Sequence, residues 1–134
     1  MQTIGVIGGS GELGGGLALR WAKAGIPVII GPRDAARAQQ VADQLNATAG
    51  NDLAKGMDNC AAAGAAEIGL LAVKFSHQQT TLEAIKSALA GKILIDTTVP
   101  LVPPKVARVQ LPPEGSAAVI AQRLLGEAVQ VVSA

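Results

Sequence analysis

Aromatic side chains are nearly absent from this sequence, whose 134 residues include one Trp, one Phe and no Tyr. A hydrophobic core must therefore be built from Ala, Val, Ile and Leu, which suit helices packed closely on a sheet. Hydrophobic residues make up 49% of the chain and charged residues 16%, a balance that excludes intrinsic disorder. The length is that of a single domain.

Cysteine, net charge and long apolar runs are also scarce. Cys60 is the only cysteine, which excludes an intramolecular disulfide and fits a reducing cytoplasm. The net charge of +1 gives no bias toward nucleic acid or an anionic membrane, so we expect neither as a partner. The longest apolar region, residues 61–73, is interrupted by Glu67 and is too short to span a bilayer. The N-terminus lacks the features of a signal peptide, and we expect a cytoplasmic protein.

Short apolar runs typical of buried strands alternate along the chain with helical patterns. We expect strands at residues 3–7, 26–30, 52–55, 68–73, 92–98 and 129–133, and helices at residues 13–24, 34–46, 59–66, 76–90 and 116–125. Prolines between residues 100 and 113 predict a long irregular crossover before the last helix. The alternation predicts an α/β fold, a doubly wound parallel sheet of six strands in the order 3-2-1-4-5-6, with helices on both faces.

Two polar residues are expected to mark helix starts. Ser76 is a candidate N-cap for the fourth helix, which should end at Gly91. Asp34 falls in the first turn of the second helix, where the helix dipole favours an acid.

Glycine is concentrated where the first strand meets the first helix, in the stretch "VIGGSGELGGG" at residues 6–16. Gly9, Gly11 and Gly14 form G-x-G-x-x-G, and Gly8 with Gly11 and Gly14 forms an alternative register. Such a loop turns sharply, leaves its backbone bare of side chains and offers N–H groups to a pyrophosphate. Its position between strand and helix predicts dinucleotide binding; the alternative is a tight turn without a ligand.

The end of the second strand favours NADP over NAD. NAD enzymes usually carry an acid about 20 residues after the glycines, but here Gly31 and Pro32 offer no carboxylate. Arg33 and Arg37 follow, and guanidinium groups bind a 2′-phosphate with paired donors. Asp34 keeps a second interpretation open, because it could be the ribose-binding acid displaced along the chain.

No residue pattern indicates acid–base, nucleophilic or metal chemistry. His77 is the single histidine, and we interpret it as an ordinary residue at a helix start. Cys60 has no histidine near it in sequence, and the acids Asp58, Glu67 and Asp96 show no metal-ligand spacing. We therefore nominate no catalytic residue and no metal ligand, although Asp96 at a strand end is a weak candidate for ligand contact.

Taken together, these segments resemble one family, the NADPH-dependent reductases of the deazaflavin coenzyme F420. The resemblance rests on the segments "IGVIGGSGELGGGLALRWAKAG", "VIIGPRDAARA", "AEIGLLAVKFSHQQTTL", "ILIDTTVPLVP" and "GSAAVIAQRLLGEAVQVVSA". It implies that residues 1–134 form an NADP-binding Rossmann domain. It also implies hydride transfer between NADP(H) and coenzyme F420, in which the protein mainly orients two rings.

The resemblance carries binding roles onto particular residues. Those matching the pyrophosphate loop are Gly8, Gly9, Ser10, Gly11, Glu12 and Leu13. Those matching the 2′-phosphate site are Pro32, Arg33 and Arg37, with Pro32 in place of a small hydroxyl residue. Those bordering the nicotinamide are Val73, Lys74, Phe75, Val99 and Pro100. Lys74 departs from the family pattern, where an apolar residue or Pro is expected.

Length is the largest departure from the family. The resemblance implies a further, smaller helical domain after "VVSA" that helps enclose the deazaflavin and supports a homodimer, and we expect this chain to lack it. Two other interpretations remain open. One is a stand-alone nucleotide-sensing Rossmann module without catalysis, and the other is an NADP-dependent reductase related to imine or short-chain acid reductases.

Overall fold

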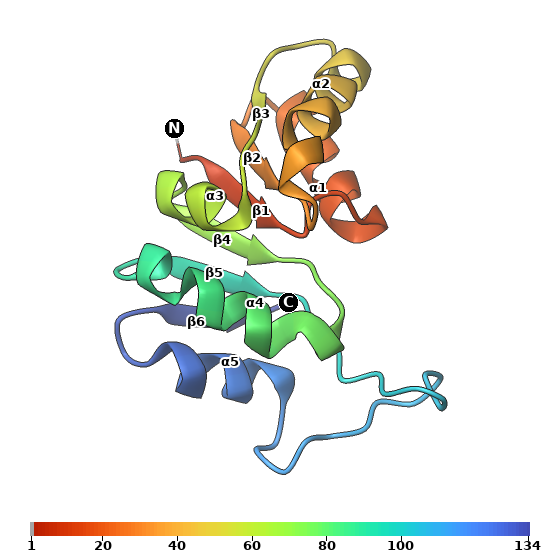
Figure 1. The fold of residues 1–134 in the computed structure, drawn as a ribbon, viewed down its shortest axis with the longest axis vertical. Coiled ribbons are helices and arrows are strands. Elements are labelled where there is room, and N and C mark those ends of the chain that lie inside the picture. The colour runs from red at the N-terminus through yellow and green to blue at the C-terminus, as the bar shows by residue number, and fades with distance from the viewer. Residues whose placement is uncertain (1) are drawn as a thin grey trace.

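Six parallel strands form one open sheet in the computed structural model, which describes residues 2–134 (Figure 1). The strands are β1 (Ile4–Ile7), β2 (Val28–Gly31), β3 (Ala54–Gly56), β4 (Ile68–Leu71), β5 (Ile93–Asp96) and β6 (Gln130–Ser133). Their order in the sheet, β3-β2-β1-β4-β5-β6, confirms the predicted doubly wound topology. The chain reverses its direction of travel across the sheet between β1 and β4, which is where ligands bind in such folds.

Helices cover both faces of the sheet, as predicted. They are α1 (Glu12–Lys23), α2 (Ala38–Ala49), α3 (Asn59–Ala65), α4 (Gln78–Ile85) and α5 (Ala117–Leu125). Neighbouring residues of a strand point to opposite faces. Val6 accordingly packs in a cluster with α1 and α2, whereas Ile7 packs in a second cluster with α3, α4 and α5.

Close helix–sheet approach accounts for the shortage of aromatic residues. A Cβ at Gly5 of β1 would lie 2.7 Å from the Ala62 carbonyl oxygen of α3, so β1 and α3 touch backbone to backbone. Both clusters are filled mainly by Ala, Val, Ile and Leu, and their most buried helix positions include Ala18, Ala22 and Ala62, each 0% exposed. A larger side chain at these positions would push the helix off the sheet.

The starts of two helices differ from expectation because each begins with a 3₁₀ turn. Ser76 lies inside the turn Phe75–His77 and is not an N-cap; Lys74 precedes that turn and α4 begins only at Gln78. Asp34 is the N-cap of the turn Ala35–Arg37, where its Oδ1 accepts a hydrogen bond from the Ala36 N–H at 3.1 Å. The tighter turn lets the chain change direction at the edge of the sheet before the α-helix starts.

The third strand, Ala54–Gly56, begins two residues later than expected, and a side chain from α2 holds it in place. The Asn46 amide accepts a hydrogen bond from the Ala54 N–H at 2.8 Å and donates one to the Ala54 carbonyl at 2.9 Å. Helix α2 continues past its predicted end at Asn46 to Ala49, and it stops at Gly50, whose φ of 77° is the left-handed conformation that glycine accepts.

The beginning of β1 is tied to the residue that precedes β4. The Thr3 N–H donates a hydrogen bond to the exposed Glu67 carboxylate. This bond favours the charged form and holds the pKa of Glu67 below its ordinary value.

Residues 97–116 form an irregular excursion, here called the arm, which projects from the sheet between β5 and α5 (Figure 1). Leu101 and Val109 form an antiparallel bridge within it, and the Gln110 N–H donates to the Pro100 carbonyl at 2.9 Å. Its large exposed apolar residues are Val99, Leu101, Val102, Val106, Val109 and Leu111. The proline-rich segment thus lacks helices, as predicted.

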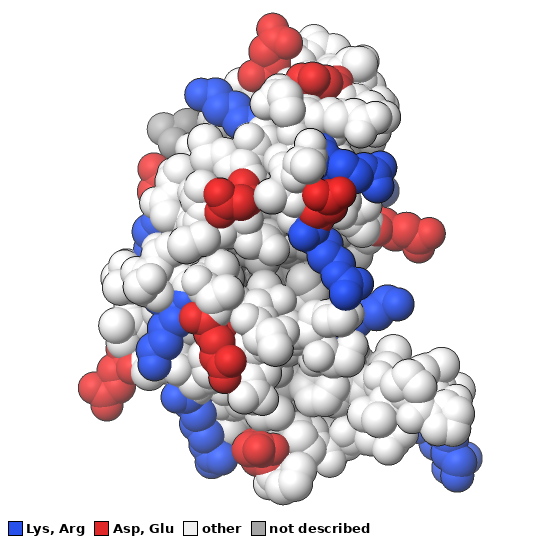
Figure 2. All heavy atoms as spheres, in the orientation of Figure 1, with Lys and Arg blue, Asp and Glu red and all other residues white. Residues whose placement is uncertain are grey.

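Charges of both signs are interspersed over the face seen in Figure 2, without a large patch of one sign. Lys and Arg side chains extend at the notch on the right of that view, above the arm and near the carboxyl ends of the strands. Within residues 2–134, no helix is long and apolar enough to cross a membrane.

Candidate functional site

The carboxyl edge of the sheet carries a tight turn after β1, in which Gly8 takes the left-handed conformation. The N–H groups of Gly8 and Gly9 both donate to the Gly31 carbonyl at the end of β2, at 2.8 and 3.1 Å. Gly8 has a φ of 82°, and a Cβ there would lie 2.5 Å from the Ala72 carbonyl oxygen. Gly8 therefore makes the turn, because other residues would be strained and would clash.

The start of α1 is left open by the residues around it. Its N-cap is Gly11, and no side chain caps the helix, whereas Asp58 caps α3 and Ser116 caps α5. A Cβ at Gly14 would lie 2.9 Å from the Gly8 carbonyl oxygen, so the first turn of α1 presses on the loop. The N–H groups of this turn have no carbonyl partner within the helix. They create a positive electrostatic potential at the helix N-terminus.

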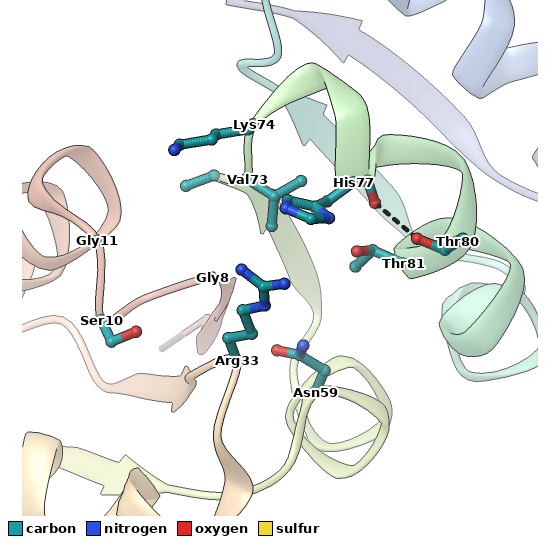
Figure 3. A pocket seen from close by; sticks show the side chains of 11 residues that line it. Gly8, Ser10, Gly11, Arg33, Asn59, Val73, Lys74, His77, Thr80 and Thr81 are labelled. Atoms are coloured by element: carbon teal, nitrogen blue, oxygen red, sulfur yellow. Dashed lines mark hydrogen bonds between the residues drawn. The ribbon is translucent and has the colours of Figure 1, made fainter.

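A cavity of about 390 Å³, here called the central cavity, opens beside this loop (Figure 3). Its lining residues are Gly8, Ser10, Gly11, Arg33, Asn59, Ala72, Val73, Lys74, His77, Thr80 and Thr81. Arg33 extends into it between the loop and Asn59, and Lys74 reaches across its mouth toward the side of Gly11 (Figure 3). Two cationic side chains and no carboxylate line it, which favours an anionic ligand.

A second cavity of about 360 Å³, the arginine cavity, lies after β2. Ser10, Pro32, Arg33, Asp34 and Arg37 line it, and Ser10 and Arg33 are shared with the central cavity. Both guanidinium groups belong to exposed residues, so they are free to reach a ligand at the surface. One carboxylate oxygen of Asp34 is already bound to the Ala36 N–H.

A third cavity, also about 360 Å³ and here called the apolar cavity, lies where the arm passes the loop after β4. It is lined by Val73, Lys74, Phe75, Ser76, Val99, Leu101, Pro103 and Val106. Val73 and Lys74 are shared with the central cavity, so the three cavities form a continuous row. Along that row the lining changes from the guanidinium groups of Arg33 and Arg37, through the glycine loop with polar side chains facing it, to mainly aliphatic and aromatic carbon.

A buried polar network supports the apolar end of the row. Gln78, 1% exposed, donates from Nε2 to Asp96 Oδ2 and to the Ala117 carbonyl, both at 2.8 Å, and to Thr98 Oγ1 at 3.1 Å. The Thr98 N–H in turn donates to Asp96 Oδ1 at 2.8 Å. The network joins α4, β5, the root of the arm and α5, and it fixes where the arm leaves the sheet.

Most of the residues expected from the sequence meet in this row. Those on the cavity walls are Gly8, Ser10, Gly11, Pro32, Arg33, Arg37, Val73, Lys74, Phe75 and Val99. Those on none of the three walls are Gly9, Glu12, Leu13 and Pro100. Gly9 and Pro100 are buried, and the side chains of Glu12 and Leu13 are exposed at the start of α1.

Several wall residues were not found from the sequence. Asn59 is the first residue of α3, after the helix N-cap Asp58 and three residues beyond the end of β3, at the same sheet edge as the glycine loop. Its Oδ1 is buried without a hydrogen-bond partner in the described part of the chain. Thr80 and Thr81 line the cavity from α4. Asn59 could have been predicted from its position beyond the carboxyl end of a strand, whereas nothing in the sequence pointed to Thr80 and Thr81.

The groups set aside earlier fall in different places. His77 lines the central cavity, Cys60 is exposed, and Asp96 is buried in the Gln78 network rather than on a cavity wall. Across residues 2–134, no cluster of three or more His, Cys, Asp or Glu could hold a metal ion.

The sequence matches a known family over most of its length. The family described as coenzyme F420-dependent NADP oxidoreductase matches residues 3–100. The F420-dependent NADP reductase of Methanothermobacter marburgensis is 46% identical over 102 residues, which cover 75% of this chain and 46% of that protein. The protein of the same name from Methanocaldococcus jannaschii is 34% identical, over 99% of this chain and 62% of that protein. The chain thus spans about half the length of the curated relatives it matches.

Solved structures agree on the architecture. A putative F420-dependent NADP-reductase from Arthrobacter sp. FB24 superposes with a TM-score of 0.79 at 26% identity, covering 99% of this chain and 61% of that one. A pyrroline-5-carboxylate reductase from Coxiella burnetii superposes with a TM-score of 0.68 at 20% identity, covering 98% and 43%. The second similarity, at this identity, concerns the fold.

Proposed function

Because the chain belongs to the family of coenzyme F420-dependent NADP oxidoreductases, we propose that it binds NADP(H) along the row of three cavities. The supporting observation is the order of the row, since its chemistry changes in the same sequence as the parts of the nucleotide. The 2′-phosphate lies at the arginine cavity, the adenosine and pyrophosphate at the central cavity, and the nicotinamide at the apolar cavity.

The residues present fit this ligand. At Gly11 an added Cβ would meet only the Gly8 carbonyl oxygen, at 3.5 Å, so the backbone there stays bare on its outer side. Arg33 and Arg37 supply paired donors for a phosphate monoester. Asn59, Thr80 and Thr81 add polar side chains on the wall of the central cavity, where a ligand hydroxyl or amino group can find a hydrogen-bond partner.

The reaction we propose is hydride transfer between the nicotinamide of NADP(H) and the deazaflavin ring of coenzyme F420. Both rings supply the redox chemistry themselves, so the protein has to bind, orient and exclude water. Phe75, Val99 and Leu101 offer apolar surface for a ring, and the Gln78 network fixes the arm that carries two of them. No side chain is assigned a proton-transfer role, because hydride transfer between two such rings does not require one.

The dinucleotide assignment is tested at Arg33. We expect wild-type protein to bind NADPH more tightly than NADH when both are titrated by fluorescence or calorimetry. Arg33→Glu should weaken NADPH by about tenfold to a hundredfold, and NADH much less, because only NADPH carries the 2′-phosphate. Arg123→Glu is the control, since Arg123 is exposed on α5 away from the row. Equal losses for both nucleotides would show that Arg33 does not read the phosphate.

Turnover is tested by mixing NADPH with oxidised coenzyme F420 and following the deazaflavin absorbance in the visible range. Bleaching indicates that the protein supports hydride transfer from NADPH to the deazaflavin. NADPH preference without bleaching indicates a binding unit that needs further residues for turnover. NADH preference without bleaching would instead favour a nucleotide-sensing module, with Asp34 as its ribose-binding acid.

Location and assembly complete the proposal. A cytoplasmic location is supported by the unpaired, exposed Cys60, which a reducing compartment tolerates. A homodimer is supported by the exposed apolar residues of the arm. Neither nucleic acid nor a membrane is proposed as a partner, in keeping with the net charge of +1.

A further inference from the structure

Lys74 lines both the central and the apolar cavity, whereas the other cationic residue of the central cavity, Arg33, does not line the apolar one. It lies three residues after the end of β4, in the loop that leads to α4. Because the Lys74 side chain is exposed, its ammonium is available to an anionic group of a ligand at the mouth of these cavities.

The backbone of Lys74 is held firmly while its side chain remains exposed. It precedes the 3₁₀ turn Phe75–His77, and its carbonyl accepts a hydrogen bond from the His77 N–H at 2.9 Å. From there the side chain extends across the mouth of the central cavity toward the side of Gly11, opposite the wall on which Arg33 and Asn59 lie (Figure 3). The ammonium and the open N-terminal turn of α1 thus face the same space from two sides.

No carboxylate occupies that space. The walls of the central and apolar cavities contain no Asp or Glu. Glu12, in the first turn of α1, is exposed and lines none of the three cavities of the row. The other titratable or charged side chains lining the central cavity are Arg33 and His77. An anion at the mouth would therefore meet positive potential from Lys74 and from the helix start, with no competing acid on the walls.

We propose that the Lys74 ammonium binds the pyrophosphate of the dinucleotide from the side opposite the glycine loop, so that the diphosphate is held between neutral N–H donors and one cation. This inference rests on the proposed function, because it presupposes a dinucleotide in the row. It assigns a role that the glycine motif does not contain. The pyrophosphate is common to NADPH and NADH, so Lys74 contributes affinity for both, whereas Arg33 and Arg37 discriminate between them.

The test compares Lys74→Gln, which removes the charge at similar length, with Lys74→Arg, which keeps it. Lys86→Gln is the matched control, because Lys86 is exposed after α4 and lines none of the three cavities. NADPH and NADH are titrated into each protein, and inorganic pyrophosphate is used as a competitor. Unfolding midpoints confirm that each variant is folded.

We expect Lys74→Gln to weaken NADPH and NADH by the same factor, about threefold to tenfold, as befits one charge-assisted contact in a solvent-accessible site. Pyrophosphate should compete less well with this variant. The loss should shrink between about 50 mM and about 500 mM salt, since screening weakens the wild-type contact. Lys74→Arg should retain most of the affinity, and Lys86→Gln should match wild type.

Three results would overturn the assignment: unchanged affinities in Lys74→Gln, a loss confined to NADPH, or an equal loss in Lys86→Gln. A loss confined to NADPH would place Lys74 at the 2′-phosphate. Failure of the proposed function looks different, because wild-type protein would then bind neither nucleotide. Wild-type binding with an unaffected Lys74→Gln variant removes only the role of Lys74.

Discussion

Gly14 and Gly16 lie two residues apart in α1, and their surroundings give them opposite effects on stability. A Cβ at Gly14 would come within 2.9 Å of the Gly8 carbonyl oxygen and 3.2 Å of the Ala72 Cβ, so backbone would have to move. A Cβ at Gly16 would meet only the end of the Arg20 side chain, at 3.5 Å. Close packing on the loop therefore explains Gly14 but not Gly16.

We expect Gly16→Ala to stabilise the protein by about 0.5–1 kcal/mol, because alanine costs a helix less backbone entropy and meets no obstacle here. Gly14→Ala should destabilise it by about 1–3 kcal/mol, since the added methyl group overpacks the loop. Urea unfolding at equilibrium measures both changes. The explanation fails if Gly16→Ala lowers the free energy of unfolding or if Gly14→Ala leaves it unchanged.

The same residues show what a sequence can supply at this scale. The spacing of Gly8, Gly11 and Gly14 indicates a phosphate-binding turn, because residues with a side chain rarely fit the conformations and close contacts of such a turn. The sequence did not show which glycine takes the left-handed conformation, because Gly8 and Gly9 differ only in what surrounds them after folding. The orientation of Lys74 was equally out of reach, since it depends on the 3₁₀ turn that follows it.

At the level of elements, Gln78 at the first position of α4 determines how three other parts of the chain meet. Its Nε2 reaches the Asp96 carboxylate of β5, Thr98 in the arm and the Ala117 carbonyl of α5. A buried carboxylate that loses a donor pays the cost of its own desolvation. Removal of one member therefore leaves the other buried polar groups without a hydrogen-bond partner, which lowers the free energy of unfolding.

We expect Gln78→Leu to destabilise the protein by about 2–4 kcal/mol, whereas Gln79→Leu should change stability by less than about 0.5 kcal/mol. Gln79 is the matched control, because it is exposed and bonds only to Glu83 at 3.0 Å within its own helix. Combining Gln78→Leu with Asp96→Leu should cost less than the sum of the two changes, since no charge is left unpaired. Additive losses in thermal or urea unfolding would contradict a coupled network.

Element order could be predicted from the sequence, but element boundaries and their joints could not. Short apolar runs indicated the strands near β1, β2, β4, β5 and β6, because buried parallel strands require apolar sequence. The three-residue β3 has no such run, and only its approximate place was predicted, at residues 52–55. The fourth helix was expected to start at Ser76, a good capping residue, but the tertiary bonds of Gln78 place the start of α4 at that residue instead. A glutamine at a helix start gives no sign in the sequence that it will be buried.

Over the whole molecule, the site is a property of topology more than of any one segment. The cavity walls come from the loops after β1, β2, β3, β4 and β5, which the strand order brings to one edge. The sequence predicted this edge and wall residues after β1, β2, β4 and β5, but not Asn59 after β3. It did not predict Leu101, Pro103 and Val106, because the path of the arm over the apolar cavity is set by bonds within the arm and by the Gln78 network.

The order of the cavities predicts that a ligand with only the adenosine half of NADPH protects amides from hydrogen exchange only around the arginine and central cavities. Adenosine 2′,5′-bisphosphate carries the 2′-phosphate and one phosphate of the bridge but lacks the nicotinamide riboside. It should therefore slow amide hydrogen exchange at residues 8–15 and 33–37 and leave the arm amides of Leu101, Val102 and Val106 unchanged. NADPH should slow all of these amides, because the nicotinamide fills the apolar cavity against the arm. Residues 122–131, from the end of α5 to the start of β6, line none of the three cavities and serve as the internal control. Protection of the arm by the bisphosphate, or its absence with NADPH, would show that the nucleotide does not run from the arginine cavity to the apolar cavity.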